Sequence, residues 1–283
     1  MYSDGQKLIR DEQLDALYLC VPPTAHGNLE ILAAQKGIHL FVEKPVNITL
    51  KAASAVSQAI RDCGVMSQAG YVLRYLPLFM RAREFLKNQE VGTAHVFRWN
   101  GLVGSPWWRR YDESGGQLVE MTTHQVDLLR WIMGEVKAVS ASYSRDRLHR
   151  GDPTVSVPDS QAVLLRFRSE ASATISTSCA IGTAYHGGID FVINGARVSI
   201  QGEQIVVDPP DSYALPPEPI DCPGIDESFV RAVATGDRSL LKSPYDDAAV
   251  TLAVTLAANR SAEAGGCQIN LDEFTRQEAG PGQ

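Results

Sequence analysis

Two groups of residues carry side chains suited to acid–base chemistry. The first is Glu43-Lys44-Pro45, which directly follows an apolar segment at residues 38–42. Ligands of open parallel sheets bind beyond the carboxyl ends of the strands, so a lysine there can reach a bound substrate. Its ammonium group would donate a hydrogen bond to an alcohol oxygen and stabilise an alkoxide while hydride leaves the same carbon. The alternative interpretation is a surface lysine in an ion-paired turn.

The second group has residues at steps of four, three and four: Glu120, His124, Asp127 and Trp131. This spacing predicts that all four lie on one face of a helix. Imidazole titrates near neutral pH, so His124 could take or return the hydroxyl proton while Glu120 or Asp127 orients its ring. A solvated helix face with a structural histidine is the competing interpretation, and the spacing alone favours neither.

Aromatic and arginine side chains flank these groups. Tyr71 and Arg74 follow the third predicted strand, and Trp108 and Arg109 stand shortly before a Gly-Gly pair. Rings stack on the C–H faces of sugars and arginines bind hydroxyls or carboxylates, so these four are candidate substrate-binding residues. Tryptophans more often pack than bind ligands, which favours a wall or loop anchor for Trp108. His26, after Pro22-Pro23, is placed to face a cofactor at the end of the first strand.

The elements that must position these residues follow two patterns. Short apolar runs at 14–21, 38–42 and 65–69 alternate with helical stretches, the second of which spans Leu50 to Cys63. Strand, helix and strand in tight succession indicate parallel βαβ units. The chain is therefore predicted to be α/β: a partial, doubly wound, parallel Rossmann-type sheet over residues 1–75, followed at 76–283 by an α+β domain with a mostly antiparallel open sheet.

The second domain is predicted from extended segments that follow one another with turns between them. The expected strands are 95–103, 136–144, 161–168, 171–179, 189–193, 197–200 and 204–207. Asn194-Gly195 favours a hairpin turn because both residues tolerate positive φ. The expected helices are 77–88, 117–133, 227–234 and 246–264, and the last of these could pack back on the first domain.

Composition excludes several classes of function. A net charge of -7 and a pI near 5.4 argue against attraction to nucleic acid or to an anionic membrane surface. The five cysteines form no Cys-x-x-Cys pair, so we expect neither a zinc site nor another metal site. The polar first residues and the lack of a long apolar run favour a cytoplasmic location. A small molecule is the expected partner.

The chain resembles the Gfo/Idh/MocA family, named for glucose-fructose oxidoreductase and inositol dehydrogenase. The similarity rests on LDALYLCVPPTAHGNLEILAAQKGIHLFVEKP, on SGGQLVEMTTHQVDLLRWIMGEV and on FVRAVATGDRSLLKSPYDDAAVTLAVTLAANRSA. It implies that Lys44 and His124 are catalytic, with Glu120 where most members have aspartate. It also implies a sugar or polyol substrate, NAD or NADP as cofactor, and homo-oligomers formed through the carboxyl-terminal sheet. Val21, Pro22, Glu43 and Lys44 would line the nicotinamide ribose.

One family feature is missing from the sequence. Gly-x-Gly-x-x-Gly, whose amides hold the pyrophosphate, does not occur in the 283 residues. Two further βα units, on the order of 60 residues, would be expected before Leu14. A wrong start or fragment, a partner chain and a degenerate protein are the three explanations. The functional alternatives are accordingly a non-catalytic sugar-binding or regulatory protein, and a metal-dependent isomerase or hydrolase using Glu120, His124 and Asp127.

Overall fold

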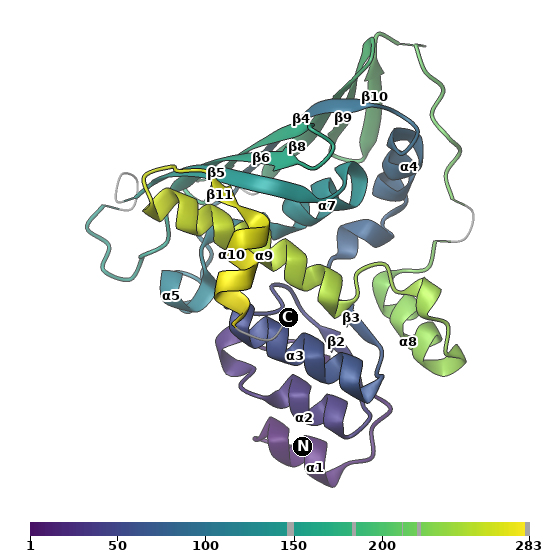
Figure 1. The fold of residues 1–283 in the computed structure, drawn as a ribbon, viewed down its shortest axis with the longest axis vertical. Helices are drawn as coiled ribbons and strands as arrows, with labels where there is room; N and C mark the ends of the chain where they lie inside the picture. Colours follow the sequence, from purple (N-terminus) through teal and green to yellow (C-terminus); the bar gives the residue numbers. More distant parts are fainter. Residues whose placement is uncertain (146–149, 183–184, 211, 220–221, 281–283) are drawn as a thin grey trace.

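The computed structural model describes residues 1–145, 150–182, 185–210, 212–219 and 222–280. It contains two sheets, a small one near the amino terminus and a large one, with most of the helices lying between or beside them (Figure 1). The long helix α9 (Tyr245–Glu263) lies between the two sheets in this view. Among the described residues, no helix is both long enough and apolar enough to cross a membrane.

The small sheet is parallel, as predicted. Its order is β1 (Ala16–Leu19), β2 (His39–Val42), β3 (Ser67–Ala69), and each strand is paired with the next along the chain. The connections contain a 3-10 turn (Pro23–Ala25), α2 (Leu29–Gln35) and α3 (Leu50–Cys63), and α1 (Gly5–Asp11) precedes the sheet. Helix α3 has the predicted bounds. They are set by Thr49, whose Oγ1 accepts from the Ala52 amide, and by Gly64, which ends the helix at φ 67°.

The large sheet has the order β10-β9-β8-β4-β7-β6-β5-β11. Its pairs are antiparallel except β4 with β7, so the mostly antiparallel prediction is confirmed. Gly195, at φ 72°, turns the chain from β8 to β9 as expected. The strands are β4 (Val91–Trp99), β5 (Val136–Ser144), β6 (Ser160–Phe167), β7 (Ser172–Ser178), β8 (His186–Ile193), β9 (Ala196–Gln201), β10 (Gln204–Asp208) and β11 (Ile269–Asn270).

One predicted helix is divided, and several observed helices, among them α1, were not predicted. The expected helix at 117–133 is split into α6 (Gln117–Glu120) and α7 (Thr123–Met133). The last helix, α10 (Leu271–Ala279), and its neighbour β11 had no counterpart in the prediction. The other helical segments are 3-10 turns at Val72–Tyr75 and Arg238–Leu240, α4 (Pro77–Leu86), α5 (Tyr111–Ser114) and α8 (Ile225–Thr235).

A single apolar cluster joins the two sheets. It contains Leu40 of the small sheet, Val96 of the large sheet and Leu252 of α9, each at most 1% exposed. Helix α9 contacts α3 and β3 on one side and β5 and α7 on the other. Tyr245 at its start donates to the Val46 carbonyl at 3.2 Å, and the Ala141 amide of β5 donates to Ser261 at 2.9 Å. Helix α9 thus packs against elements of the first part of the chain.

Candidate active site

Lys44 stands at the carboxyl end of β2 and points toward the end of α6. Its Nζ donates to the Glu120 carbonyl oxygen at 2.8 Å and to Glu120 Oε1 at 2.5 Å. The two side chains are 14% and 10% exposed. An ion pair that is this well shielded is stronger than one at the surface. Lys44 is therefore held across the gap between the first sheet and the helices of the second part.

The Glu120 carboxylate has a second fixed partner. Trp108 Nε1 donates to Glu120 Oε2 at 2.6 Å, and the indole is 1% exposed. The sequence made Trp108 a candidate substrate contact, but its ring is buried and its only polar atom is used by Glu120. Trp108 thus anchors the carboxylate that holds Lys44, in agreement with the anchor interpretation.

His124 lies in the first turn of α7, near Lys44. Its Nδ1 is buried and has no hydrogen-bond partner, and the Tyr71 ring meets its ring edge-on with centroids 6.0 Å apart. Burial, followed by the positive charges of Lys44 and Arg98, lowers the pKa of His124 to about 3. The imidazole is consequently neutral at physiological pH, the form that can accept a proton.

The prediction of one continuous polar helix face is wrong. The chain breaks its helix at Met121-Thr122, where the Thr122 amide donates to the Gln117 carbonyl at 2.9 Å. Glu120 ends α6 and turns to Lys44, whereas Asp127 is on α7 and turns elsewhere. The structure gives the His124 ring no hydrogen bond to either carboxylate, so the expected orientation of the imidazole by Glu120 or Asp127 is not observed.

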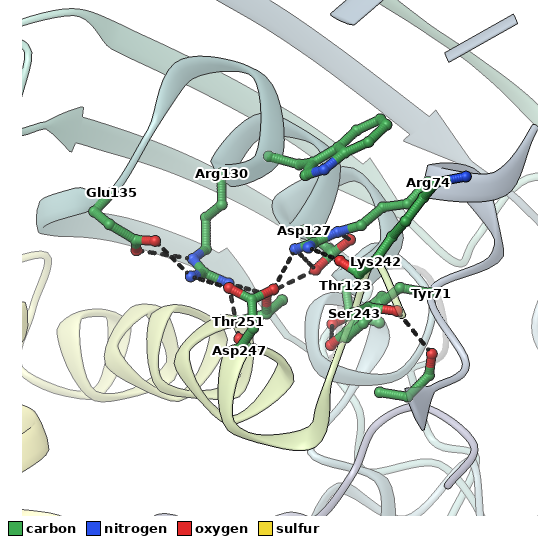
Figure 2. Close-up of polar contacts among 12 residues, drawn as sticks. Tyr71, Arg74, Thr123, Asp127, Arg130, Glu135, Lys242, Ser243, Asp247 and Thr251 are labelled. Atoms are coloured by element: carbon green, nitrogen blue, oxygen red, sulfur yellow. Dashed lines mark hydrogen bonds and ion pairs between the residues drawn. The ribbon is translucent and has the colours of Figure 1, made fainter. Parts of the chain in front are cut away.

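Asp127 and Arg74 form a buried ion pair, as Figure 2 shows. Arg74 Nε and Nη2 donate to the two Asp127 oxygens at 2.7 and 2.6 Å. Thr251 of α9 donates to the same carboxylate at 3.0 Å, and Asp127 is 0% exposed. The polar atoms of both residues tie α7 to α9 and to the turn after β3. Their substrate-binding roles stay predictions.

Three further candidates brace the local structure. Tyr71 is 1% exposed, and its hydroxyl is 2.9 Å from Thr123 Oγ1. Arg109 Nε donates to the Val103 carbonyl at 3.0 Å. His26 is 2% exposed, with its ring nitrogens 2.6 Å from Glu30 Oε1 and 3.2 Å from the Val21 carbonyl. The His26 ring is therefore enclosed, and its contact with a cofactor stays a prediction.

The ends of the three parallel strands fit the nicotinamide end of a dinucleotide. Val21, after β1, is 42% exposed, which leaves apolar surface for a flat ring beside Pro22. The Glu43 carboxylate lies against Gly70, where an added Cβ would come within 2.6 Å of it, and its Oε2 accepts from the Lys44 amide at 3.1 Å. The Glu43 carboxylate suits the hydroxyls of the ribose, and His124 Nδ1, which has no hydrogen-bond partner, suits the hydroxyl on the reacting carbon. No residue of the sequence offers a Gly-x-Gly-x-x-Gly turn for the pyrophosphate.

Sequence reasoning missed Arg98 of β4. Its Nε is buried without a hydrogen-bond partner, and its charge acts on His124. Side chains of a strand alternate between its two faces, and Arg98 lies on the same face as the buried Ala94 and Val96. That alternation could have indicated that Arg98 points inward. Among the described residues, no group of three His, Cys, Asp or Glu side chains is arranged to hold a metal ion. A cavity of about 750 Å³ between α3, α9 and α10 is not lined by Lys44 or His124.

Comparison with known proteins agrees with this architecture. Residues 1–71 match the model of an oxidoreductase family with an NAD-binding Rossmann fold, and residues 79–204 match that of the Gfo/Idh/MocA C-terminal domain. The chain is 32% identical over 182 residues to an uncharacterized oxidoreductase, YrbE, of Bacillus subtilis, covering 62% of this chain and 52% of the relative. It is 31% identical over 183 residues to myo-inositol 2-dehydrogenase of Thermotoga maritima, covering 62% and 53%.

The chain thus spans about half the length of these two curated relatives. An oxidoreductase from Agrobacterium radiobacter, solved with NAD+, L-tartaric acid and magnesium, has a similar structure. Its TM-score is 0.80 at 18% identity, over 96% of this chain and 84% of that one, a likeness that shows the fold. The two domain matches, found on the parallel and the mostly antiparallel parts of the structure, identify the chain as a member of the Gfo/Idh/MocA family of oxidoreductases.

Proposed function

We propose that this protein is an NAD(P)-dependent oxidoreductase that acts on the CH–OH group of a sugar, polyol or related hydroxy compound. The observation that carries the proposal is the meeting of Lys44 and His124: an ammonium group anchored by Glu120 and a neutral imidazole with an unpaired nitrogen. The inositol dehydrogenase among its relatives supports the substrate class.

The roles of the side chains follow from their charge states. Lys44 would donate a hydrogen bond to the substrate oxygen and stabilise negative charge as it develops there. His124, being neutral, would accept the hydroxyl proton in the oxidative direction and return it in the reductive direction. Glu120 keeps the ammonium in place through both of its contacts with Lys44. When bound, the nicotinamide supplies the hydride acceptor or donor.

Replacing the two central residues tests the proposal. With NAD+ or NADP+ and a panel of sugars and inositols, Lys44→Met and His124→Ala are each expected to lower kcat by about a hundredfold or more, the range for losing a positioned acid or base. The rate is followed by absorbance of the reduced cofactor. Lys51→Met, an exposed lysine on α3, is the matched control and should keep the wild-type rate.

Two results would contradict the proposal. Unchanged turnover in the Lys44 or His124 variant would remove the assigned roles. Sugar binding without saturable cofactor binding in calorimetry would instead favour a sugar-binding or regulatory protein.

We further propose that two copies associate through the outer face of the large sheet. This face is the one not covered by helices, and it carries exposed apolar side chains on separate strands: Leu164 of β6 is 40% exposed and Val192 of β8 is 46% exposed. Phe97 and Trp99 of β4 lie between them, with ring centroids 5.4 Å apart. Apolar surface spread over several strands is typical of protein interfaces.

A further inference from the structure

Arg98 extends from the helix-covered face of the large sheet toward the site. It pairs in register with Thr177 of β7 and Gly187 of β8. Thr177 Oγ1 donates to the Arg98 carbonyl at 2.9 Å and lies 2.7 Å from Thr122 Oγ1, two residues before His124. Paired residues of neighbouring strands present their side chains on the same face, so Arg98 is directed to the same region as Thr122.

The guanidinium of Arg98 has an aromatic neighbour. It lies 4.7 Å from the centre of the Tyr185 ring. Gly187 makes room for that ring, because a Cβ there would overlap the Tyr185 hydroxyl. The ring therefore covers one side of the guanidinium.

No carboxylate in the described parts of the chain forms an ion pair with Arg98, and its Nε is buried without a hydrogen-bond partner. Glu120 is a carboxylate whose charge acts on Arg98, but its two oxygens are taken by Lys44 and Trp108. Glu43 is turned toward Gly70. A desolvated cation without a counter-ion is costly and is retained where a ligand supplies the missing charge.

We propose that Arg98 binds a carboxylate carried by the substrate, so that the site takes acidic sugars or hydroxy acids in preference to neutral polyols. This rests on the proposed function for the position of the reacting carbon between Lys44 and His124. The carboxylate would pair with the guanidinium through charge-assisted hydrogen bonds. Lys44 and Glu120 neutralise each other, which leaves one unmatched positive charge. A carboxylate matches that charge, whereas a phosphate monoester would add nearly two negative charges beside Glu120.

Binding of two sugars that differ by one group tests the assignment. D-glucuronate and D-glucose are titrated into the full chain in a calorimeter, with glucose 6-phosphate as a third arm. Glucuronate is expected to bind at least about tenfold more tightly than glucose, the effect of a charge-assisted hydrogen-bond pair. Arg98→Met should remove that preference and leave the glucose affinity within about twofold. Arg98→Lys should fall between them because it keeps the charge without the planar fork.

Arg83→Met is the control, since the Arg83 guanidinium also lies over a ring, 4.5 Å from that of Trp131, but on α4. It should bind all three ligands like the wild type. The melting temperature without ligand separates a binding role from a structural one: Arg98→Met should melt no lower than the wild type, because no ion pair is lost. A clear drop would assign Arg98 to the fold.

The proposal is overturned if the wild type does not prefer glucuronate to glucose, if Arg98→Met keeps the preference, or if glucose 6-phosphate binds more tightly than glucuronate. Failure of the proposed function gives a different pattern: no hydride transfer in any variant, while Arg98→Met still weakens glucuronate binding. Equal kcat/KM on glucose and glucuronate, with Lys44 and His124 essential, would keep the oxidoreductase function and reject the role of Arg98.

Discussion

His124 makes the stability of the folded chain depend on pH. Burial and the charges of Lys44 and Arg98 lower its pKa to about 3, whereas the unfolded value is about 6.5. Above pH 6.5 both states are neutral and the stability contribution is complete. As pH falls toward 3, His124 becomes protonated in the unfolded chain but stays neutral in the folded chain, so this contribution to stability is progressively lost.

Comparing His124→Asn with the wild type isolates that effect. Between pH 7 and pH 4.5 the wild type should lose about 2–3 kcal/mol more free energy of unfolding than the variant. The reason is that pH 4.5 lies about two units below the unfolded pKa, and each unit corresponds to about 1.4 kcal/mol. Urea denaturation at both pH values measures the difference. His95→Asn, which removes an exposed imidazole on the large sheet, serves as the control. Parallel losses in the wild type and His124→Asn would show that the imidazole is not desolvated in solution.

At the level of single residues, part of the candidate site could be predicted from the sequence. Lys44 and His124 could be selected because a lysine after a buried strand and an imidazole after a Gly-Gly pair are unusual in type and position. The ion pair of Arg74 with Asp127 was not predicted, because charge alone does not reveal whether a side chain reaches solvent or an opposite charge 53 residues away along the chain. Arg98 was missed because which face of a strand meets the site depends on how the sheet packs.

The Arg74–Asp127 pair shows how whole elements are fixed beneath the site. It connects α7, which carries His124, to the turn after β3, and Thr251 extends the link to α9 (Figure 2). Asp127→Asn removes the buried carboxylate that pairs with the Arg74 guanidinium. It should lower the free energy of unfolding by about 3–5 kcal/mol. Chemical denaturation at neutral pH measures this loss.

An exposed pair provides the comparison for Asp127. Lys137→Met breaks a contact of 3.2 Å with Glu170, where the side chains are 54% and 71% exposed. It should cost about 1 kcal/mol or less. If Asp127→Asn costs no more than Lys137→Met, the buried pair does not hold α7 in place.

The elements themselves were largely predictable. Helix α3 was found with its correct ends because Thr49 and Gly64 are strong local signals. The break between α6 and α7 was not predicted, because neither Met121 nor Thr122 is a helix-breaking glycine or proline. The interruption is stabilised by contacts such as that of Thr122 with Thr177 on β7. Helix α10 was overlooked because its polar sequence has only Leu271 and Phe274 buried.

For the whole molecule, the proposed pairing of two copies can be tested by placing charge on the large sheet. Leu164→Glu and Val192→Glu should each convert a dimer to monomers, because two like charges would face each other or be buried at the interface. Light scattering after size-exclusion chromatography measures the mass. Val230→Glu is the control, since Val230 is 56% exposed but lies on α8. A monomeric wild type, or a dimer that survives both sheet variants, would contradict the pairing.

The position of α9 has a consequence for how the chain acquires its structure during synthesis. The strands of the small sheet are translated well before α9, the helix that contacts β3 and places Tyr245 against the Val46 carbonyl. On the ribosome, β1 to β3 must therefore remain without this cover while β4 to β10 of the large sheet are made. The small sheet is therefore completed only after most of the large sheet has been synthesised, and premature termination before residue 245 would leave it permanently without the cover of α9.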